Sequence, residues 1–259
     1  MNTAVLNGLA YAFELISSYG ILRALIEGAI VVGLWLGLQR TTLSGRARIA
    51  TWLAIAVPLL AWFAVVFQLA RSGALPSIPL LIVVPVAVGL ALLMRSQRVA
   101  EVLDATPPTW LVGLQVYRVF GATFLVQWGL GHLNGVFAVS AGVGDVLVGV
   151  LALPAVFYLR SGARGGRAIA VTWNLLGIFD LVVAVTLGIL SQSGLLHSFG
   201  VQPTPLGYPL VMIPAFAVPQ ALILHGLSLW QLRRGARRLA AAATPAPPFK
   251  PSSASAAAA

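Results

Sequence analysis

The basic residues of this chain are concentrated in every second gap between its hydrophobic segments. Thirteen of its sixteen lysines and arginines lie in these gaps, the last group in the C-terminal stretch. They are Arg40, Arg46, Arg48, Arg95, Arg98, Arg160, Arg164, Arg167, Arg233, Arg234, Arg237, Arg238 and Lys250. The intervening gaps, near 71–77, 132–144 and 191–208, contain only Arg71. Because basic residues are retained on the cytoplasmic side during insertion, this alternation predicts a chain that crosses a membrane repeatedly.

Seven hydrophobic segments have the length of a membrane-spanning helix. Such a helix needs about 20 mostly apolar residues to cross the ~30 Å hydrocarbon layer. The segments cover roughly 20–38, 50–70, 78–94, 111–131, 143–159, 168–190 and 209–231. With a basic C-terminus inside, an odd number of passes places the N-terminus outside. The sequence therefore predicts an all-α fold, a polytopic integral membrane bundle of seven transmembrane helices.

The two ends of the chain are predicted to lie outside a transmembrane domain of residues 20–238. Residues 1–19 are apolar enough to be helical, but the stretch 17–20 is too short to reverse the chain between two spans. We interpret them as an outer-surface helix or an extension of the first span, with an eighth membrane helix as the alternative. Residues 239–259 are rich in alanine, proline and serine and lack apolar periodicity, which predicts a disordered cytoplasmic tail.

The composition limits the classes of partner. Charged residues make up 8% of the chain, whereas a soluble domain carries about 25%. The net charge of +10 is divided among short loops and a tail, so no continuous basic surface follows a nucleic-acid backbone. We expect no nucleic-acid partner, and attraction of the arginine loops to anionic lipid headgroups. The alanine-, leucine- and arginine-rich composition suggests the inner (cytoplasmic) membrane of a bacterium.

Arg118 and Asp180 are charged residues within predicted spans. Their expected depths from the inner ends are about 12 Å and about 18 Å. An aspartate at mid-bilayer costs about 2.5–3.5 kcal/mol on insertion scales unless it faces protein, water or a cation. Since an extended arginine can bridge this difference in depth, we predict a buried Arg118–Asp180 pair. The alternatives are an Arg118 that snorkels to the headgroups and a protonated Asp180 that bonds to another neighbour.

A regular helical wheel places polar and small residues of the fourth span on one face, which is expected to point into the bundle. This face consists of Gln115, Arg118, Gly121, Ala122, Leu125, Gly129 and His132. The opposite face consists mainly of Val116, Val119, Phe120, Thr123 and Phe124. Asn174 and His225 fall at a similar depth on spans six and seven, so we predict an inner polar patch that they share with Gln115 and Arg118. His225 is either a proton carrier or a packed hydrogen-bonding residue.

Polar residues also gather at the predicted outer side. They are His132, Asn134, Asp145 and His197. The glycines around 142–144 favour a turn that opens span five, where Asp145 suits a helix N-terminus. The alternative is an outward-facing metal or proton site formed by His132, Asp145 and His197, although their spacing specifies no metal. Near the same side Arg23 and Glu27 stand four residues apart, which predicts a pair on one helix face.

Three classes of function remain open. The intramembrane Asp180, Arg118 and His225 favour passage of a small solute, ion or proton through the bundle. A noncatalytic assembly, sensory or accessory protein would use the same residues only to orient helices. A membrane enzyme or a metal- or haem-binding protein would use the outer His132, Asp145 and His197. The chain has no cysteine, and its only lysine is Lys250 in the tail, so a retinal Schiff base in the bundle is excluded. No catalytic residue and no cofactor are predicted.

Overall fold

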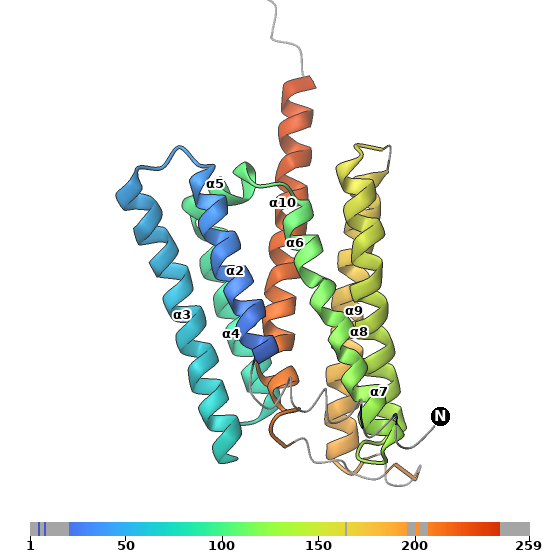
Figure 1. Cartoon of the computed structure of the whole chain (residues 1–259). Helices are drawn as coiled ribbons and strands as arrows, with labels where there is room; N and C mark the ends of the chain where they lie inside the picture. Colours follow the sequence, from blue (N-terminus) through green and yellow to red (C-terminus); the bar gives the residue numbers. More distant parts are fainter. Residues whose placement is uncertain are drawn as a thin grey trace, which may run out of the picture.

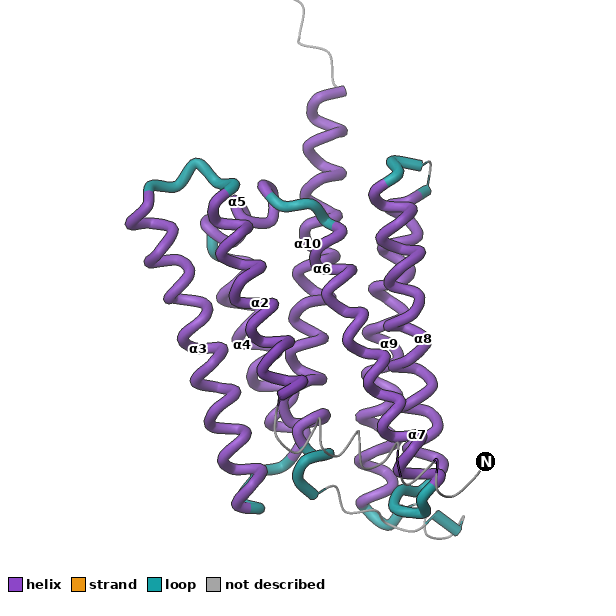
Figure 2. Tube along the Cα trace, viewed as in Figure 1, coloured by secondary structure: helices purple, strands orange, loops and turns teal. Residues whose placement is uncertain are grey.

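The computed structural model describes residues 21–163, 165–195, 200–201 and 207–243, together with Val5 and Gly8. These residues form helices, turns and loops without a strand (Figure 2). Most of the N-terminal piece 1–19 and the tail beyond Ala243 lie outside the described residues. The predictions of an outer-surface helix, of an eighth span and of a disordered tail therefore stay predictions for those segments.

Seven helical spans in the described residues are long and apolar enough to cross a membrane, which confirms the predicted fold class. Five of them are single helices. They are α2 (Ile21–Gln39), α3 (Gly45–Ser72), α4 (Ile78–Arg95), α8 (Gly135–Arg160) and α9 (Gly166–Gln192). The fourth span in chain order joins α6 (Thr109–Leu114), η1 (Gln115–Gly121) and α7 (Ala122–Gly129), and the last joins η3 (Ile213–Ala217) to α10 (Val218–Ala243). A short amphipathic helix, α5 (Gln97–Ala105), precedes the fourth span.

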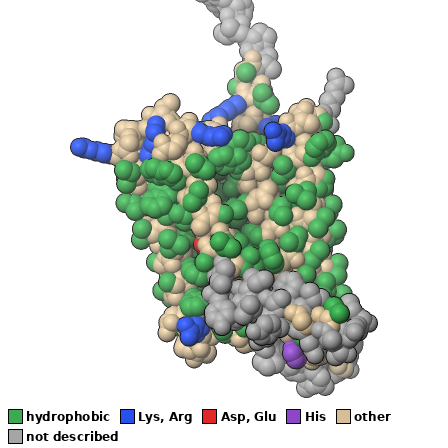
Figure 3. All heavy atoms as spheres, viewed as in Figure 1, with side chains coloured by type: hydrophobic (Ala, Val, Ile, Leu, Met, Phe, Trp, Pro, Cys, Tyr) green, Lys and Arg blue, Asp and Glu red, His purple; other side chains and the backbone are tan. Residues whose placement is uncertain are grey.

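Successive spans run in opposite directions, so the loops alternate between the two ends of the bundle (Figure 1). Loop 40–44, the turn 161–163, helix α5 and the C-terminal end of α10 share one end, and loops 73–77 and 130–134 share the other. Lysine and arginine side chains gather at the first end, above a broad band of hydrophobic side chains (Figure 3). We call it the arginine-rich end. This separation is the one that the basic loops predict.

Helix α10 lies at the centre of the bundle (Figure 1). In its apolar segment 61% of the residues are buried, against 6% in α4. It packs against α4, α9 and η3, while α8 packs against α9, η1 and α7. The spans therefore form two groups, with α2, α3 and α4 on one side of α10 and the fourth span, α8 and α9 on the other (Figure 1).

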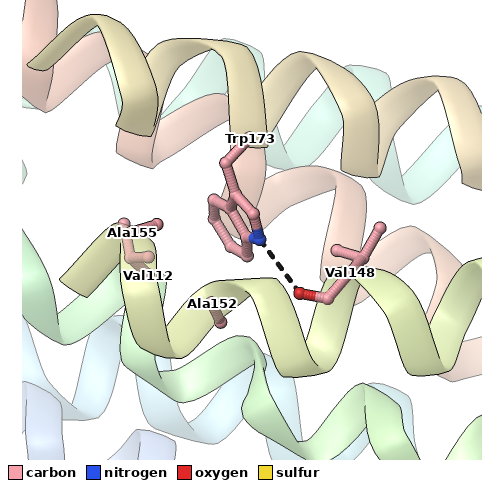
Figure 4. Close-up of a cluster of buried hydrophobic side chains, with 5 residues drawn as sticks. All are labelled: Val112, Val148, Ala152, Ala155 and Trp173. Atoms are coloured by element: carbon pink, nitrogen blue, oxygen red, sulfur yellow. Dashed lines mark hydrogen bonds between the residues drawn. The ribbon is translucent and has the colours of Figure 1, made fainter. Parts of the chain in front are cut away.

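Helix α9 is held to α8 by a tryptophan in a small-residue core (Figure 4). Trp173 donates its indole N–H to the carbonyl oxygen of Val148 over 2.9 Å, and its ring lies beside Ala152 and Ala155. The small alanine side chains allow the two helix backbones to approach closely. The hydrogen bond gives the buried indole N–H of Trp173 an acceptor.

The fourth span differs from the regular helix on which its predicted face was based. Residues Gln115–Gly121 form a 3₁₀ helix, in which residues three apart are aligned. Gln115, Arg118 and Gly121 are accordingly all buried, as predicted. Each 3₁₀ residue turns the chain about 20° further than an α-helical residue, or about 140° over this segment. The predicted faces of α7 are therefore wrong: Thr123 and Phe124 are buried, and Gly129 is exposed.

The fifth span begins eight residues before the predicted position 143. The side chain of Asn134 caps α8 by accepting from the backbone N–H of Phe137 over 3.0 Å. Gly142 and Gly144 lie inside the helix, where they allow close packing and do not form a turn. The prediction that Asp145 opens the helix is wrong, because the capping residue is Asn134 and Asp145 lies about 16 Å further along α8.

The last span is irregular at its start. Residues Ile213–Ala217 form a π-helical turn, with Pro214 inside it and Pro219 two residues after its end. Because Pro219 has no N–H to donate to the preceding turn, the local α-helical hydrogen bonding is interrupted there. At its other end α10 continues to Ala243, five residues past the predicted boundary at 238. The alanines at 240–243 have the highest intrinsic helix propensity, which explains this extension.

The contact between α8 and η1 generates a prediction about Gly149. A Cβ atom at this position would lie 2.7 Å from the backbone nitrogen of Val119, whereas a Cβ atom at Gly33 would meet no atom within 4 Å. We expect Gly149→Ala to lower the free energy of unfolding by about 1–3 kcal/mol. The control Gly33→Ala is expected to leave it unchanged or to raise it by about 0.5–1 kcal/mol, because alanine favours the helix. Unfolding of both variants in detergent micelles measures the difference, and equal effects would contradict the close contact.

Candidate functional site

Arg118 is the centre of a buried polar cluster, 3% exposed and supplied with acceptors from α8, α9 and α10. Its Nε donates to Asp145 Oδ1 over 2.7 Å, and its Nη2 pairs with both Asp145 and Asp180. Its Nη1 lies 3.3 Å from the carbonyl oxygen of Gly177 and 3.2 Å from His225 Nε2. Every nitrogen of the guanidinium thus has an acceptor. The structure contains the predicted Arg118–Asp180 pair, and Arg118 does not extend towards the headgroups.

The second aspartate changes the charge balance of this cluster. One arginine, Arg118, carries one positive charge, while Asp145 and Asp180 together carry two negative charges when both are ionised. The three groups lie near the middles of their spans. With both aspartates ionised, the cluster has a net charge of −1 within the hydrocarbon layer, which a proton or a cation would neutralise.

Arg118 also determines how His225 bonds. An arginine can only donate hydrogen bonds, so Nε2 of His225 is the acceptor of Arg118 and carries no proton. The proton of the neutral ring is then on Nδ1, which donates to Asn174 Oδ1 over 2.9 Å. The amide of Asn174 in turn donates to Ser228 Oγ over 3.0 Å. Of the two roles predicted for His225, this geometry favours the packed hydrogen-bonding residue.

The predicted inner patch is therefore assembled in part. Arg118, His225 and Asn174 form one hydrogen-bonded chain. Gln115 is buried as predicted, but it donates to the carbonyl oxygen of Ala221 over 3.2 Å and is not joined to the chain through a hydrogen bond in the described residues.

Glycines on three helices provide the space for this cluster. At each of them a Cβ atom would overlap a side chain of the cluster. The pairs are Gly121 with Asp145, Gly144 with Asp180, and Gly177 with His225. The charged groups can meet because the backbones next to them carry no side chain, which is the physical reason for glycine at these helical positions.

A second polar cluster joins α2 to α10. Arg23 Nη1 lies 3.3 Å from Glu27 and donates to Gln220 Oε1 over 2.7 Å. The amide of Gln220 donates to both carboxylate oxygens of Glu27, over 2.7 and 2.6 Å. The Arg23–Glu27 pair predicted from their spacing is therefore present, and the structure adds Gln220 to it. The guanidinium of Arg23 also lies over the ring of Tyr117, 5.4 Å from its centroid.

A cavity of about 110 Å³ lies between the two clusters. It reaches from Leu22 and Pro209, near the end opposite the arginine-rich one, to Arg118 and Asp145 near mid-span. Most of its walls are apolar. The polar side chains that line it are Arg23, Tyr117, Arg118, Thr123 and Asp145. Its volume corresponds to roughly three or four liquid waters, so it accommodates a small solute.

The described members of the predicted outer site, His132, Asn134 and Asp145, serve separate roles. The imidazole Nδ1 of His132 is 2.7 Å from Gln127 Oε1 at the end of the fourth span. Asn134 caps α8, and Asp145 belongs to the Arg118 cluster. His197 lies outside the described residues. Among the residues that the structure does describe, no group of three His, Cys, Asp or Glu side chains could hold a metal ion.

Sequence reasoning missed the role of Asp145 and the participation of Tyr117 and Gln220. For Asp145 a usable signal was present, because Asn134 is a strong helix-capping residue followed by a continuous apolar stretch. For Tyr117 and Gln220 no local signal exists, since their partners are more than ninety positions away in the sequence.

The spans and their buried ionic cluster define a multi-pass α-helical membrane protein. The chain belongs to the family described as Domain of unknown function (DUF8737), whose model matches residues 75–233. This region includes Arg118, Asp145, Asp180 and His225 but not Arg23 or Glu27. No curated protein shows significant similarity to the chain. No solved structure shows significant similarity either.

The charge balance of the cluster predicts how its members contribute to stability. Arg118→Leu would leave two aspartates without a cation, so we expect a loss of about 3–5 kcal/mol in the free energy of unfolding. Asp180→Asn is expected to cost less, because Asp145 still pairs with Arg118. Adding Asp145→Asn and Asp180→Asn to Arg118→Leu should restore part of the loss. Denaturation in detergent measures all three proteins; a triple variant less stable than Arg118→Leu would contradict this account.

Proposed function

We propose that the protein is a transporter that passes a small solute or ion through the bundle, with a proton taken up and released at the Asp145–Arg118–Asp180 cluster. The observation that carries the proposal is the pairing of one arginine with two aspartates beside a cavity at mid-span. The proposal requires no bound cofactor and no catalytic residue.

The charge of the cluster supports a bound proton or cation. A net charge of −1 in hydrocarbon is unfavourable, and a proton on either aspartate removes it. Oδ2 of Asp145 and Oδ1 of Asp180 accept no hydrogen bond from the described residues, so each has a free site for that proton. Protonation of an aspartate weakens its electrostatic attraction to Arg118. The charge state of the cluster is therefore coupled to the contacts between η1, α8 and α9.

The distribution of polar groups supports entry from one side. The cavity extends from near the end opposite the arginine-rich one to Asp145. Beyond Arg118, the packed hydrogen-bonding residues His225, Asn174 and Ser228 add polar groups towards the arginine-rich end. The π-helical turn at Ile213–Ala217 lies beside the cavity, and such turns are places where a helix can change its hydrogen bonding.

A noncatalytic assembly, sensory or accessory role is the second candidate. The observation that favours it is the close packing around the charges, in which Gly121, Gly144 and Gly177 fit against the cluster without room to spare. In that role Arg118 would only fix the relative positions of four spans. A metal- or haem-binding enzyme is the third candidate, and it would depend on His132 and on His197.

The location and orientation belong to the same proposal. We place the arginine-rich end in the cytoplasm, with the N-terminus outside, and the protein in the inner membrane of a bacterium. There the arginines would attract anionic lipid headgroups, each contributing about 1 kcal/mol near a charged surface. The seven apolar spans require a lipid bilayer environment.

The orientation is tested with reporter fusions. A fusion after Ser44 or after Ala243 is expected to report a cytoplasmic location, and a fusion after Ala74 or after Leu130 a location on the opposite side, because the basic loops are retained inside. A paired set of phosphatase and fluorescent-protein fusions measures both sides. The reverse pattern at these four positions would overturn the orientation while leaving the fold unchanged.

The transport proposal is tested in liposomes that contain a pH-sensitive dye. We expect the reconstituted protein to move protons across the membrane when one of a series of small ions, acids, amines or sugars is supplied. Asp145→Asn and Asp180→Asn should reduce this movement to the level of protein-free liposomes, because neither amide can exchange a proton.

The matched control is Asp104→Asn. Asp104 is an aspartate paired with Arg234 over 2.5 Å and with Arg238, at the arginine-rich end and away from the cavity. This variant should retain transport. If the wild type moves no solute and no proton in this series, or if all three variants behave alike, the accessory role is the better explanation.

A further inference from the structure

Arg23 and Arg118 both line the cavity but differ in the state of their donors. All nitrogens of Arg118 have acceptors within the protein. The bonds of Arg23 use Nη1 alone, which meets Glu27 and Gln220. Its Nε and Nη2 donate to no acceptor in the described part of the chain. These two atoms form the edge of a guanidinium that binds a carboxylate through two parallel hydrogen bonds.

Tyr117 provides an additional donor at the same cavity. Its hydroxyl is buried and has no hydrogen-bond partner among the described residues. A buried hydroxyl without a partner is costly, commonly by about 1–3 kcal/mol, so such a group indicates a missing acceptor. Because Arg23 stacks over the ring of Tyr117, the guanidinium and this tyrosine belong to one part of the cavity wall.

Apart from Thr123 and Asp145, the rest of the wall is apolar. Leu22, Ile26 and Phe120 lie on one part of it, and Leu210 and Ile213 on another. A ligand with its anionic group at Arg23 and Tyr117 would therefore place its hydrocarbon portion against these side chains. The volume of about 110 Å³ restricts that portion to a few carbon atoms.

We infer that this cavity binds a small organic carboxylate, with its carboxylate on Arg23 Nε and Nη2 and on the Tyr117 hydroxyl. The inference deepens the proposed function, on which it rests for the fate of the ligand, by naming the class of solute. Asp145 lies in the same cavity and would repel the carboxylate unless it is neutral. Binding of the anion and binding of a proton at Asp145 therefore favour each other.

The test uses the full-length protein, purified in a non-ionic detergent. Its melting temperature is measured with straight-chain monocarboxylates from acetate to hexanoate, and with the primary amines and alcohols of the same lengths. We expect at least one carboxylate to raise the melting temperature by roughly 3 °C or more at saturation, and amines and alcohols to have no such effect. Equal shifts for the three series, or no shift with any carboxylate, would overturn the inference.

Two variants test the residues. Arg23→Lys keeps a cation beside Glu27 but loses the planar pair of donors, so the dissociation constant of the best carboxylate should rise roughly tenfold. Tyr117→Phe keeps the ring and should raise it roughly fivefold through loss of one hydrogen bond. The controls are Arg71→Gln, an arginine over Phe67 outside the cavity, and Tyr158→Phe on the exposed side of α8. If the controls and the two cavity variants change affinity equally, the cavity is not the site.

A lipid headgroup is the other source of an anion, and a separate arm distinguishes it. The carboxylate titration is repeated in nanodiscs of zwitterionic lipid and of anionic lipid. Binding in zwitterionic nanodiscs supports a soluble carboxylate; stabilisation by anionic lipid alone, without any response to carboxylates, overturns it.

Binding in detergent needs no transport, so carboxylate binding without flux would defeat only the proposed function. Flux unaffected by Arg23→Lys and Tyr117→Phe would defeat only this inference.

Discussion

The packing of this bundle depends on the guanidinium of Arg118, which lies within the hydrocarbon layer and must therefore bond to acceptors on other helices. Arg118 meets this need with aspartates from α8 and α9, a carbonyl oxygen from α9 and an imidazole from α10. Since no water replaces these partners in a lipid environment, separation of the helices would leave several buried polar groups unpaired at once. The side chain of Arg118 thus fixes the positions of four spans relative to one another.

The irregular backbone of the bundle coincides with this cluster and its cavity. The 3₁₀ segment aligns Gln115, Arg118 and Gly121 in one row. A regular α-helix would place them on the same side but rotate each by about 60° from the one before. The π-helical turn before α10 lines another part of the cavity wall. Membrane proteins tolerate irregular backbone where it is enclosed by protein or borders a polar space, and both segments meet this condition.

Much of the fold, but less of the site, could be predicted from the sequence. The sequence predicts Arg118 and Asp180 as partners because each is costly in lipid and their depths are similar. It places Asp145 at the outer side because glycines at 142 and 144 resemble a turn in isolation. In the folded chain those glycines face Leu125 and Asp180, so they serve helix contact. Local sequence cannot distinguish these two uses of glycine, because the difference lies in what packs against it.

The sequence by itself determined the number of spans and the alternation of basic loops, since both follow from the transfer of each segment between water and lipid. It also required that the intramembrane charges have partners. Only the tertiary structure decided which partners these are: a second aspartate for Arg118, and Gln220 for the Arg23–Glu27 pair. The reason is physical. Insertion energies depend on the composition of a single segment, whereas hydrogen bonds depend on the rotation and depth of one helix relative to another.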